Sequence, residues 1–224
     1  MKRLTTIGLL PTKFRLFAHK VGHKKFRLLD VGCGNHSVRQ AKRWFPNCEY
    51  YGIDHGTYNN DSEDFQLMTE FFDLDLTVDT LGTVNDKYFD VIIVNHVIEH
   101  LSNGEHLLSR LPKKLRPGGR IYIEFPGARS LSLPSMSGTL NFCDDPTHIR
   151  VYDVKEVANI LLANGCRIIK GGVRRDWSRI ILFPVLLARG IFKNNIAGSF
   201  WDITGFAEYV YACVPGIFLG DKGI

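Results

Sequence analysis

The residues with the clearest chemical meaning are two glycines flanked by two carboxylates. The segment Leu28–Gly34 reads LLDVGCG. Glycines at 32 and 34 let the backbone turn sharply and approach a ligand closely, because a Cβ there would collide with it. Asp54 ends the strand that follows this turn in the chain. A carboxylate at that position can accept hydrogen bonds from both ribose hydroxyls of an adenosyl group. The pattern therefore predicts a nucleoside-binding site.

Asp30 indicates which nucleoside compound this site would bind. A dinucleotide places its pyrophosphate against such a turn, and a neighbouring carboxylate would repel it. S-adenosylmethionine (SAM) has no phosphate and carries a positively charged sulfur and an amino group. The acidic residues around the turn therefore favour SAM over NAD on electrostatic grounds.

Strand-like and helix-like segments alternate from about residue 26 to residue 173. This alternation predicts an α/β fold, a Rossmann-like, doubly wound, mostly parallel sheet with helices on both faces. Ligands of such sheets bind at the carboxyl ends of the strands, where the motifs lie. Strands are expected at Phe26–Val31, Glu49–Ile53, within Thr69–Leu76, and at Phe89–Asn95, Arg120–Phe125 and Cys166–Val173, with a Pro-Gly-Gly turn at 117–119. Helices are expected at residues 37–45 with Ser37 as the cap, at Ser102–Arg116 with a break near Pro112, and at Asp153–Asn164.

The order of the motifs resembles class I SAM-dependent methyltransferases. LLDVGCG, YYGID, an Asp-Leu pair at 75–76, FDVIIVNHVIEHL, LRPGGRIYIEFP and DDPTHIRVYDVKEV follow one another as in that family, over roughly residues 26–173. The final segment is also similar to small bacterial methyltransferases associated with glycan modification. The resemblance implies a SAM-binding methyltransferase domain at residues 26–175 and SAM as the cofactor.

The resemblance also implies a role for each matching position, with one departure. The departure is that the family usually has a third glycine at the position of His36. For the contact with adenine, Asp73 is an alternative to Asp75. Taken singly, a strand-end residue such as Asp54 also fits a simple turn former. The implied contacts are the methionine part of SAM for Asp30, Gly32, Cys33 and Gly34, the ribose for Asp54, the adenine for His55, Asp75 and Leu76, and the methionine end, through the backbone, for Asn95 and His96.

Methyl transfer to a hydroxyl needs alignment of the reactants, exclusion of water and removal of a proton. His148 is the preferred base, because an imidazole titrates near neutral pH, and Asp144 or Asp145 could orient it. Glu99 and His100 are further candidates. The alternative is that the segment around His148 only locks its loop. No DPPY or NPPY sequence follows the fourth strand, so by resemblance the acceptor atom is expected to be an oxygen of a sugar or other small molecule, with a lipid or quinone-like acceptor second.

Three other functions share some of these features. The sequence His96-Val-Ile-Glu99-His100 matches H-x-x-E-H, which on a helix could hold zinc in a hydrolase. The first histidine directly follows a buried strand and no third ligand is evident, so no metal is predicted. A NAD-dependent oxidoreductase shares the fold but conflicts with Asp30. A non-catalytic SAM-binding module would have the same cofactor-binding residues.

The distribution of charge and the cysteines indicate which partners the protein could bind and where in the cell it is expected. Eight of the 28 basic residues and none of the 23 acidic residues lie within residues 1–29. We expect residues 1–25 to form a basic arm that could meet phosphate, an anionic membrane or nucleic acid, or simply be solvated. Nucleic acid is not an expected partner, because aromatic residues are not interleaved regularly with the basic ones. Five cysteines without a C-x-x-C pair favour reduced thiols in the cytoplasm.

The last part of the chain, residues 176–224, is expected to be an apolar extension packed on the domain. Its apolar stretches at 180–192 and 203–219 are too short and interrupted to span a bilayer. The extension could form a lid, a homodimer interface or a surface that lies on the inner face of a membrane and serves a lipid-linked glycan. The expected partners are therefore a small-molecule or glycan acceptor, with a second copy of the chain or a lipid surface as the open alternatives.

Overall fold

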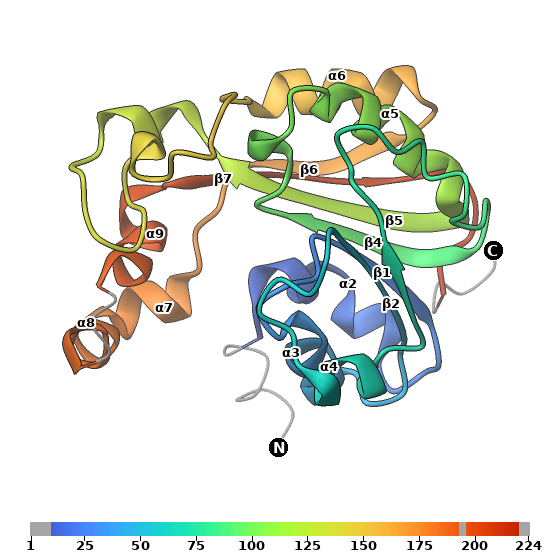
Figure 1. Ribbon diagram of the computed structural model, residues 1–224, viewed down its shortest axis with the longest axis horizontal. Coiled ribbons are helices and arrows are strands. Elements are labelled where there is room, and N and C mark those ends of the chain that lie inside the picture. The colour runs from blue at the N-terminus through green and yellow to red at the C-terminus, as the bar shows by residue number, and fades with distance from the viewer. Residues whose placement is uncertain (1–9, 193–195, 220–224) are drawn as a thin grey trace.

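The computed structural model describes residues 10–192 and 196–219, which form a seven-stranded sheet between two layers of helices (Figure 1). The strand order is β3-β2-β1-β4-β5-β7-β6. All neighbouring pairs are parallel except those of β7, which runs antiparallel to β5 and β6. This confirms the Rossmann-like, mostly parallel sheet. The strands are β1 (Arg27–Val31), β2 (Glu49–Asp54), β3 (Glu70–Asp73), β4 (Phe89–Asn95), β5 (Leu115–Pro126), β6 (Arg167–Val173) and β7 (Ala207–Cys213).

Helices cover both faces of the sheet, and a third group lies beyond the carboxyl end of β5 (Figure 1). One layer contains α2 (Thr12–Val21), α3 (Ser37–Trp44) and α4 (Ser62–Leu67), and the opposite layer contains α5 (Gly104–Lys114) and α6 (Val154–Ala163). The third group contains α7 (Trp177–Ile181), α8 (Phe183–Phe192) and α9 (Ala197–Thr204). Short 3₁₀ turns are η1 (Ile98–His100), η2 (Ala128–Ser132) and η3 (Phe142–Asp144).

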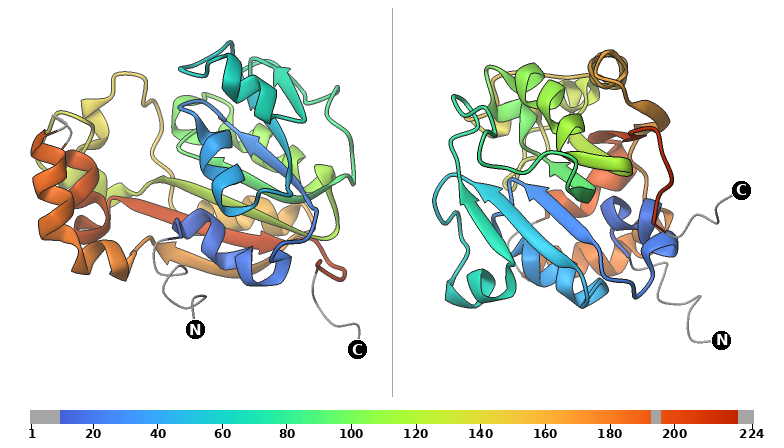
Figure 2. Two further views of the ribbon diagram at one scale, coloured as in Figure 1. Left: turned by 90° about the horizontal axis from the view of Figure 1, so that it is seen from below. Right: turned by 90° about the vertical axis from the view of Figure 1, so that its right-hand side faces the viewer.

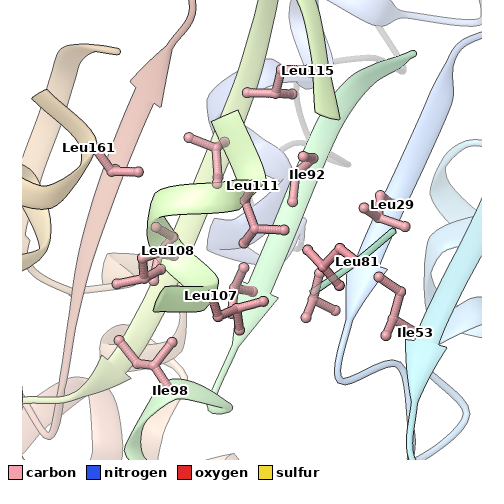
Figure 3. Close-up of a cluster of buried hydrophobic side chains, with 14 of the residues drawn as sticks. Leu29, Ile53, Leu81, Ile92, Ile98, Leu107, Leu108, Leu111, Leu115 and Leu161 are labelled. Atoms are coloured by element: carbon pink, nitrogen blue, oxygen red, sulfur yellow. The ribbon is translucent and has the colours of Figure 1, made fainter. Parts of the chain in front are cut away.

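The alternation of side chains along each strand divides the core into two parts. On β1, Leu28 faces α2 and α3, whereas Leu29 and Val31 face α5 and α6. Figure 3 shows the second part, where leucines of α5 lie next to Ile92 of the sheet and Leu81 lies beside Leu29. Burying one such side chain contributes roughly 1.5–3 kcal/mol, so both helix layers are held firmly on the strands that carry the motifs.

All six expected strands are present, but the sequence reading missed β7. Its residues fall within the stretch that we expected to be an extension, yet they pair with β5 and β6 over their whole length. The break expected in α5 near Pro112 was wrong, because the helix continues to Lys114. The turn expected at 117–119 lies within β5 as an irregularity, where Gly118 has φ of 79° and the pairing with β4 passes from Leu115 to Arg120.

The N-terminal segment is not an arm where the structure describes it. Residues 1–9 of the expected arm lie outside the described residues. Residues 12–21 form α2, in which Phe14, Phe17 and Val21 are fully buried against Phe26 and Phe45. The expectation of a basic arm was therefore wrong for this part, because the aromatic residues between the lysines and arginines anchor it as a covering helix. Within the described ranges, none of the helices has the length and apolarity needed to cross a membrane.

Candidate active site

A cavity of about 780 Å³ lies at the carboxyl ends of β1, β2 and β4, where the strand order reverses. This is the place at which doubly wound sheets bind ligands. Cys33 and Glu99 lie behind the cavity wall rather than on it. The other predicted residues all line it, namely Asp30, Gly32, Gly34, Asp54, His55, Asp75, Leu76, Asn95, His96, His100 and His148.

The glycine turn has the geometry that the sequence predicts. Gly32 has φ of 76°, and a Cβ there would lie 2.3 Å from Val97 Cγ2. A Cβ at Gly34 would lie 2.4 Å from a ring carbon of Tyr58. His36, which replaces the usual third glycine, has φ of 57°. The loop therefore keeps a left-handed residue at that position without a glycine, a conformation that is uncommon for a histidine.

Asp30 is buried beneath the turn, with its carboxylate fixed by two hydroxyl groups. Ser37 Oγ and Tyr50 Oη donate hydrogen bonds to Asp30 Oδ2 over 2.6 and 2.7 Å. We expected Ser37 to cap α3, but it is the first helical residue, and the N-cap is His36 without a side-chain cap bond. Lys13 Nζ on α2 lies 3.4 Å from Ser37 Oγ and lines the cavity. The sequence did not reveal Lys13, because only the packing of α2 brings it there.

Asp54 ends β2 with both carboxylate oxygens turned to the loops above the sheet. Oδ2 accepts the backbone N–H of Gly34, and Oδ1 accepts that of His55, each at 2.9 Å. Burial raises the pKa of Asp54, although these two hydrogen bonds act in the opposite direction. His55 lines the cavity with an exposed ring. Each oxygen of Asp54 keeps a second lone pair for a ribose hydroxyl.

The structure distinguishes between the two aspartates that could contact the adenine ring. Asp73 accepts the backbone N–H of Gly56 at 2.8 Å and does not line the cavity. Asp75 lines it, with Oδ1 held by Thr77, whose hydroxyl lowers the pKa of this carboxyl. Leu76 lies beside Asp75 on the wall. The arrangement favours Asp75 over Asp73 as the contact for an exocyclic amino group.

Cys33 points away from the cavity. Its side chain is fully buried, and burial raises the pKa of its thiol. The sulfur fills space beside Gly52 on β2, where an added Cβ would lie 2.6 Å from Sγ. Its predicted contact with SAM is therefore limited to backbone atoms.

These residues fit SAM by shape and by charge. We call this side of the cavity the cofactor half. Gly32 and Gly34 leave the space that a Cβ would fill, and three carboxylates surround it. Such a set attracts a sulfonium and an amino group and repels a pyrophosphate. The members of the cofactor half are Lys13, Asp30, Gly32, Gly34, Asp54, Asp75 and Leu76.

The other side of the cavity, the acceptor half, combines aromatic rings and imidazoles. Trp201 and Phe206 stack with ring centroids 4.9 Å apart and planes at 15°. Trp201 Nε1 donates a hydrogen bond to the Thr139 carbonyl, which fixes the indole. Sequence reasoning missed both aromatic residues, because α9 and the start of β7 are far along the chain. The acceptor half consists of His96, His100, His148, Trp201 and Phe206.

His96 is held between two carboxylates. Its ring nitrogens lie 3.2 Å from Glu99 Oε1 and 3.2 Å from Glu124 Oε1. Burial alone would lower the pKa of His96, but these two carboxylates outweigh it and raise the pKa to about 9. Burial likewise opposes ionisation of Glu124, but the charge of Arg174 and the His96 hydrogen bond lower its pKa to about 2. His96 is therefore an imidazolium at neutral pH and is unsuited to accept a proton.

His100 and His148 each keep one ring nitrogen free. His148 Nδ1 lies 2.7 Å from the carbonyl oxygen of Phe142, so this nitrogen carries the proton and Nε2 has the lone pair. Thr147 Oγ1 donates to Asp145 Oδ1 and so accepts from His100 Nδ1, 2.8 Å away. The two rings are 4.7 Å apart. In the neutral form of each ring, Nε2 is therefore the nitrogen that carries the lone pair.

Of the two aspartates proposed to orient His148, only Asp145 lies near it. Asp145 Oδ2 is 3.9 Å from His148 Nε2. Asp144 instead accepts the backbone N–H groups of Leu140 and Asn141 and fixes their loop, and the Ser135 hydroxyl lowers its pKa. This corrects the expectation for Asp144, whereas Asp145 lies near the ring, and the hydrogen bond that orients His148 goes to the Phe142 carbonyl.

Glu99 is buried behind the two imidazoles. Its backbone carbonyl accepts the N–H of Ile149, which ties the His148 loop to η1. Glu99 Oε2 has no hydrogen-bond partner among the described residues. Ligand atoms of Glu99, His100 and His148 lie within 4.8 Å of one another, so this set could hold a metal ion.

The zinc pair suggested by H-x-x-E-H does not form. The motif lies on the 3₁₀ turn η1 and the residues before it, so His96 and His100 do not share an α-helical face. His96 is occupied by Glu99 and Glu124. A second group, His36 with Asp61 and Asp64, also has metal-like spacing, but Arg39 already pairs with both of its carboxylates.

The reversed strand order, the glycine turn and the ring of carboxylates together define a class I SAM-dependent methyltransferase. Residues 8–170 match the family described as "Methyltransferase domain", and the chain belongs to this family. The cofactor is SAM, as the cofactor half requires. No curated protein matches the chain at the level of sequence.

Similar solved structures share the fold at low sequence identity. A SAM-dependent methyltransferase from Archaeoglobus fulgidus is 21% identical, with a TM-score of 0.55 over 92% of this chain and 94% of that one. One from Mesorhizobium loti is 14% identical, with a TM-score of 0.58 over 90% and 98%. The [4+2]-cyclase SpnF is 20% identical, with a TM-score of 0.59 over 90% and 80%. Since one of these proteins is named as a cyclase, the fold alone does not define the acceptor.

Proposed function

We propose that the protein transfers the methyl group of SAM to an oxygen of a sugar or similar small polar molecule. One observation carries the choice of oxygen. Two imidazoles, each bonded through Nδ1 and with Nε2 left to accept a proton in the neutral ring, face the cavity beside a stacked aromatic pair. A hydroxyl must lose a proton as it is methylated, and a neutral imidazole is suited to accept it.

The cofactor half supplies binding and orientation. When bound, SAM provides a methyl group activated by a positively charged sulfur. Asp54 would hold the two ribose hydroxyls, Asp75 the adenine amino group and Asp30 the amino group of the methionine part. Lys13 would pair with the methionine carboxylate. Because several groups hold one molecule at both ends, its reactive carbon is fixed with respect to the acceptor half.

The acceptor half supplies the platform and the base. Trp201 and Phe206 offer a flat apolar surface for the face of a sugar ring, and the surrounding polar groups select its hydroxyls. His148 Nε2 accepts the proton of the attacking hydroxyl. Asp145 stabilises the imidazolium that results, and the Phe142 carbonyl keeps the ring in the correct tautomer.

A metal-assisted form of the same reaction is a second candidate, favoured by the unpartnered Glu99 Oε2. Glu99, His100 and His148 would bind a divalent cation such as Zn²⁺, for which two imidazoles and a carboxylate are suitable ligands. The ion would then lower the pKa of the acceptor hydroxyl, and no imidazole would be needed as base. Metal content and activity after chelation separate the two forms, since only the metal-assisted form loses turnover with a chelator.

The proposal is tested by incubating the protein with SAM and a panel of monosaccharides, glycosides and nucleotide sugars. S-adenosylhomocysteine release measures turnover, and mass spectrometry locates the methyl group. We expect an O-methyl product. In His148→Gln, turnover should fall by ~10²–10⁴-fold while SAM affinity is unchanged. The matched control is His106→Gln, which alters a histidine on the surface of α5. Turnover that is unchanged in His148→Gln, or a methyl group on nitrogen or carbon, contradicts the proposal.

A further inference from the structure

Helices α7 and α8 expose large apolar side chains to solvent beside the active site. Trp177 is 68% exposed, Ile181 77%, Val185 57% and Phe192 91%. Trp177 and Ile181 lie four residues apart on α7, which is the spacing of one helix face, and Val185 and Phe192 lie seven residues apart on α8. Large apolar side chains that gather on one surface of a folded protein mark an interaction site. We call this surface the α7–α8 face.

The inner side of these helices contacts α9 and α2. Phe183 on α8 packs on Phe200 of α9 with ring centroids 5.2 Å apart, and Ser199 Oγ donates to the Leu186 carbonyl. Asp176 caps α7 and lies 3.4 Å from Arg15 of α2. The apolar side chains on the outside are therefore held in place by contacts on the inside.

The segment that forms the face has basic residues and no acidic ones. Residues 177–192 contain Arg179 and Arg189 and no acidic residue. Arg179 is paired with the buried Asp202 of α9 at 2.9 Å, so the exposed Arg189 supplies the positive charge of the face. Figure 1 shows α7 and α8 on the same side of the sheet as α2, which has lysines and arginines but no acidic residue along its length, and Figure 2 shows α7 and α8 projecting at one end of the molecule. Exposed apolar side chains beside exposed positive charge complement an anionic lipid surface.

We propose that the α7–α8 face docks on an anionic lipid bilayer. Trp177, Ile181, Val185 and Phe192 enter the boundary between headgroups and acyl chains, while Arg189 contacts the anionic headgroups. Because α8 packs on α9, which carries Trp201, docking places the acceptor half next to the membrane surface. The proposal concerns only the binding of the enzyme to a membrane, so its test does not depend on the identity of the methyl acceptor.

Vesicle flotation of the full chain tests the proposal. Vesicles of phosphatidylcholine mixed with phosphatidylglycerol are compared with vesicles of phosphatidylcholine alone. We expect binding to the mixed vesicles, with at least about tenfold loss in Ile181→Asp/Phe192→Asp, because charged side chains would have to enter the membrane boundary. Arg189→Gln should weaken binding to the mixed vesicles by about fivefold and leave binding to neutral vesicles unchanged.

The matched control is Leu162→Asp on α6, a half-exposed leucine on the opposite face of the sheet (Figure 1). It should bind vesicles as the unchanged protein does, and SAM affinity should be the same in all variants. Three outcomes overturn the proposal: absence of vesicle binding, binding that Ile181→Asp/Phe192→Asp leaves intact, or a dimer in solution that this double variant dissociates. The last result would identify the face as a contact between two copies of the chain.

Discussion

In the cofactor half of the cavity, two of the three carboxylates are held by backbone N–H groups close to them in the chain, whereas in the acceptor half the functional groups come from distant segments. Asp54 accepts N–H groups of Gly34 and His55, and Asp75 accepts that of Thr77. In the acceptor half, by contrast, η1, the loop before α6, and α9 each contribute side chains. Apart from Lys13 of α2, the cofactor half is thus built from residues at the ends of strands and in the turns that follow them. The acceptor half depends on packing that is particular to this chain.

The largest expected effect concerns the glycine turn. In Gly32→Ala, the new Cβ would clash with Val97, and the alanine would be strained by the positive φ of this position. We expect SAM affinity to fall on the order of a hundredfold, measured by calorimetry. Gly56→Ala is the matched control, because Gly56 also has positive φ, 68°, but no atom within 4 Å of an added Cβ. Similar losses in both variants would show that backbone strain, not the close approach, decides binding.

The next effect separates His96 from the other imidazoles. The pKa of folded His96 is raised to about 9, above its unfolded value of about 6.5. Its stabilising contribution is therefore complete below about pH 6.5 and is lost as pH rises through about 9. The groups that face it are Glu99 and Glu124, with Arg174 behind Glu124. We expect the free energy of unfolding to fall by roughly 3 kcal/mol across this range.

Urea unfolding at several pH values measures this change. In His96→Gln the corresponding loss should be absent, because glutamine does not titrate. Only the difference between the two proteins is attributed to His96, since other groups ionise in both. An equal pH dependence in the two proteins would show that His96 is not charged in the folded state.

A smaller effect tests the aromatic platform. Trp201→Leu keeps an apolar side chain at that position but removes the stacking with Phe206 and the hydrogen bond to Thr139. We expect the KM for the acceptor found in the panel to rise by roughly tenfold, with SAM affinity unchanged. A change confined to SAM affinity would place Trp201 in the cofactor half instead.

The smallest expected effect concerns Lys13. Lys13→Met removes the amino group near Ser37 but keeps the packing of the side-chain stem. We expect SAM to bind about threefold to fivefold more weakly, because the proposed ion pair with its carboxylate is partly exposed. Lys24→Met is the control, since Lys24 is an exposed lysine just after α2. If SAM affinity is the same in Lys13→Met, the methionine carboxylate is held elsewhere.

The same contrast explains what the sequence could predict. Asp30 and Asp54 could be placed in advance, because each follows from a strand and the turn after it. Lys13, Trp201 and Phe206 could not, because their positions depend on how α2 and α9 pack. Local signals also failed where a stronger partner was present, as when Ser37 bonded to Asp30 instead of capping α3.

The seventh strand was missed for a related reason. Residues 207–213 are apolar enough for a strand, but their antiparallel insertion between β5 and β6 depends on long-range pairing. The order of motifs fixes the parallel strands more firmly, since β1, β2 and β4 are each followed by a turn and a helix. A strand such as β7, which comes late in the chain and inserts between two earlier strands, has no such turn and helix after it to indicate it.

If the ring of carboxylates selects a cationic adenosyl compound, calorimetry will show it in the binding of SAM and NAD. The unchanged protein is titrated with SAM and, separately, with NAD, and Asp54→Asn is titrated with SAM. We expect one SAM per chain, no measurable binding of NAD, and clearly weaker binding of SAM by Asp54→Asn. Binding of NAD, or SAM affinity that does not change in Asp54→Asn, would contradict this selection by the carboxylates.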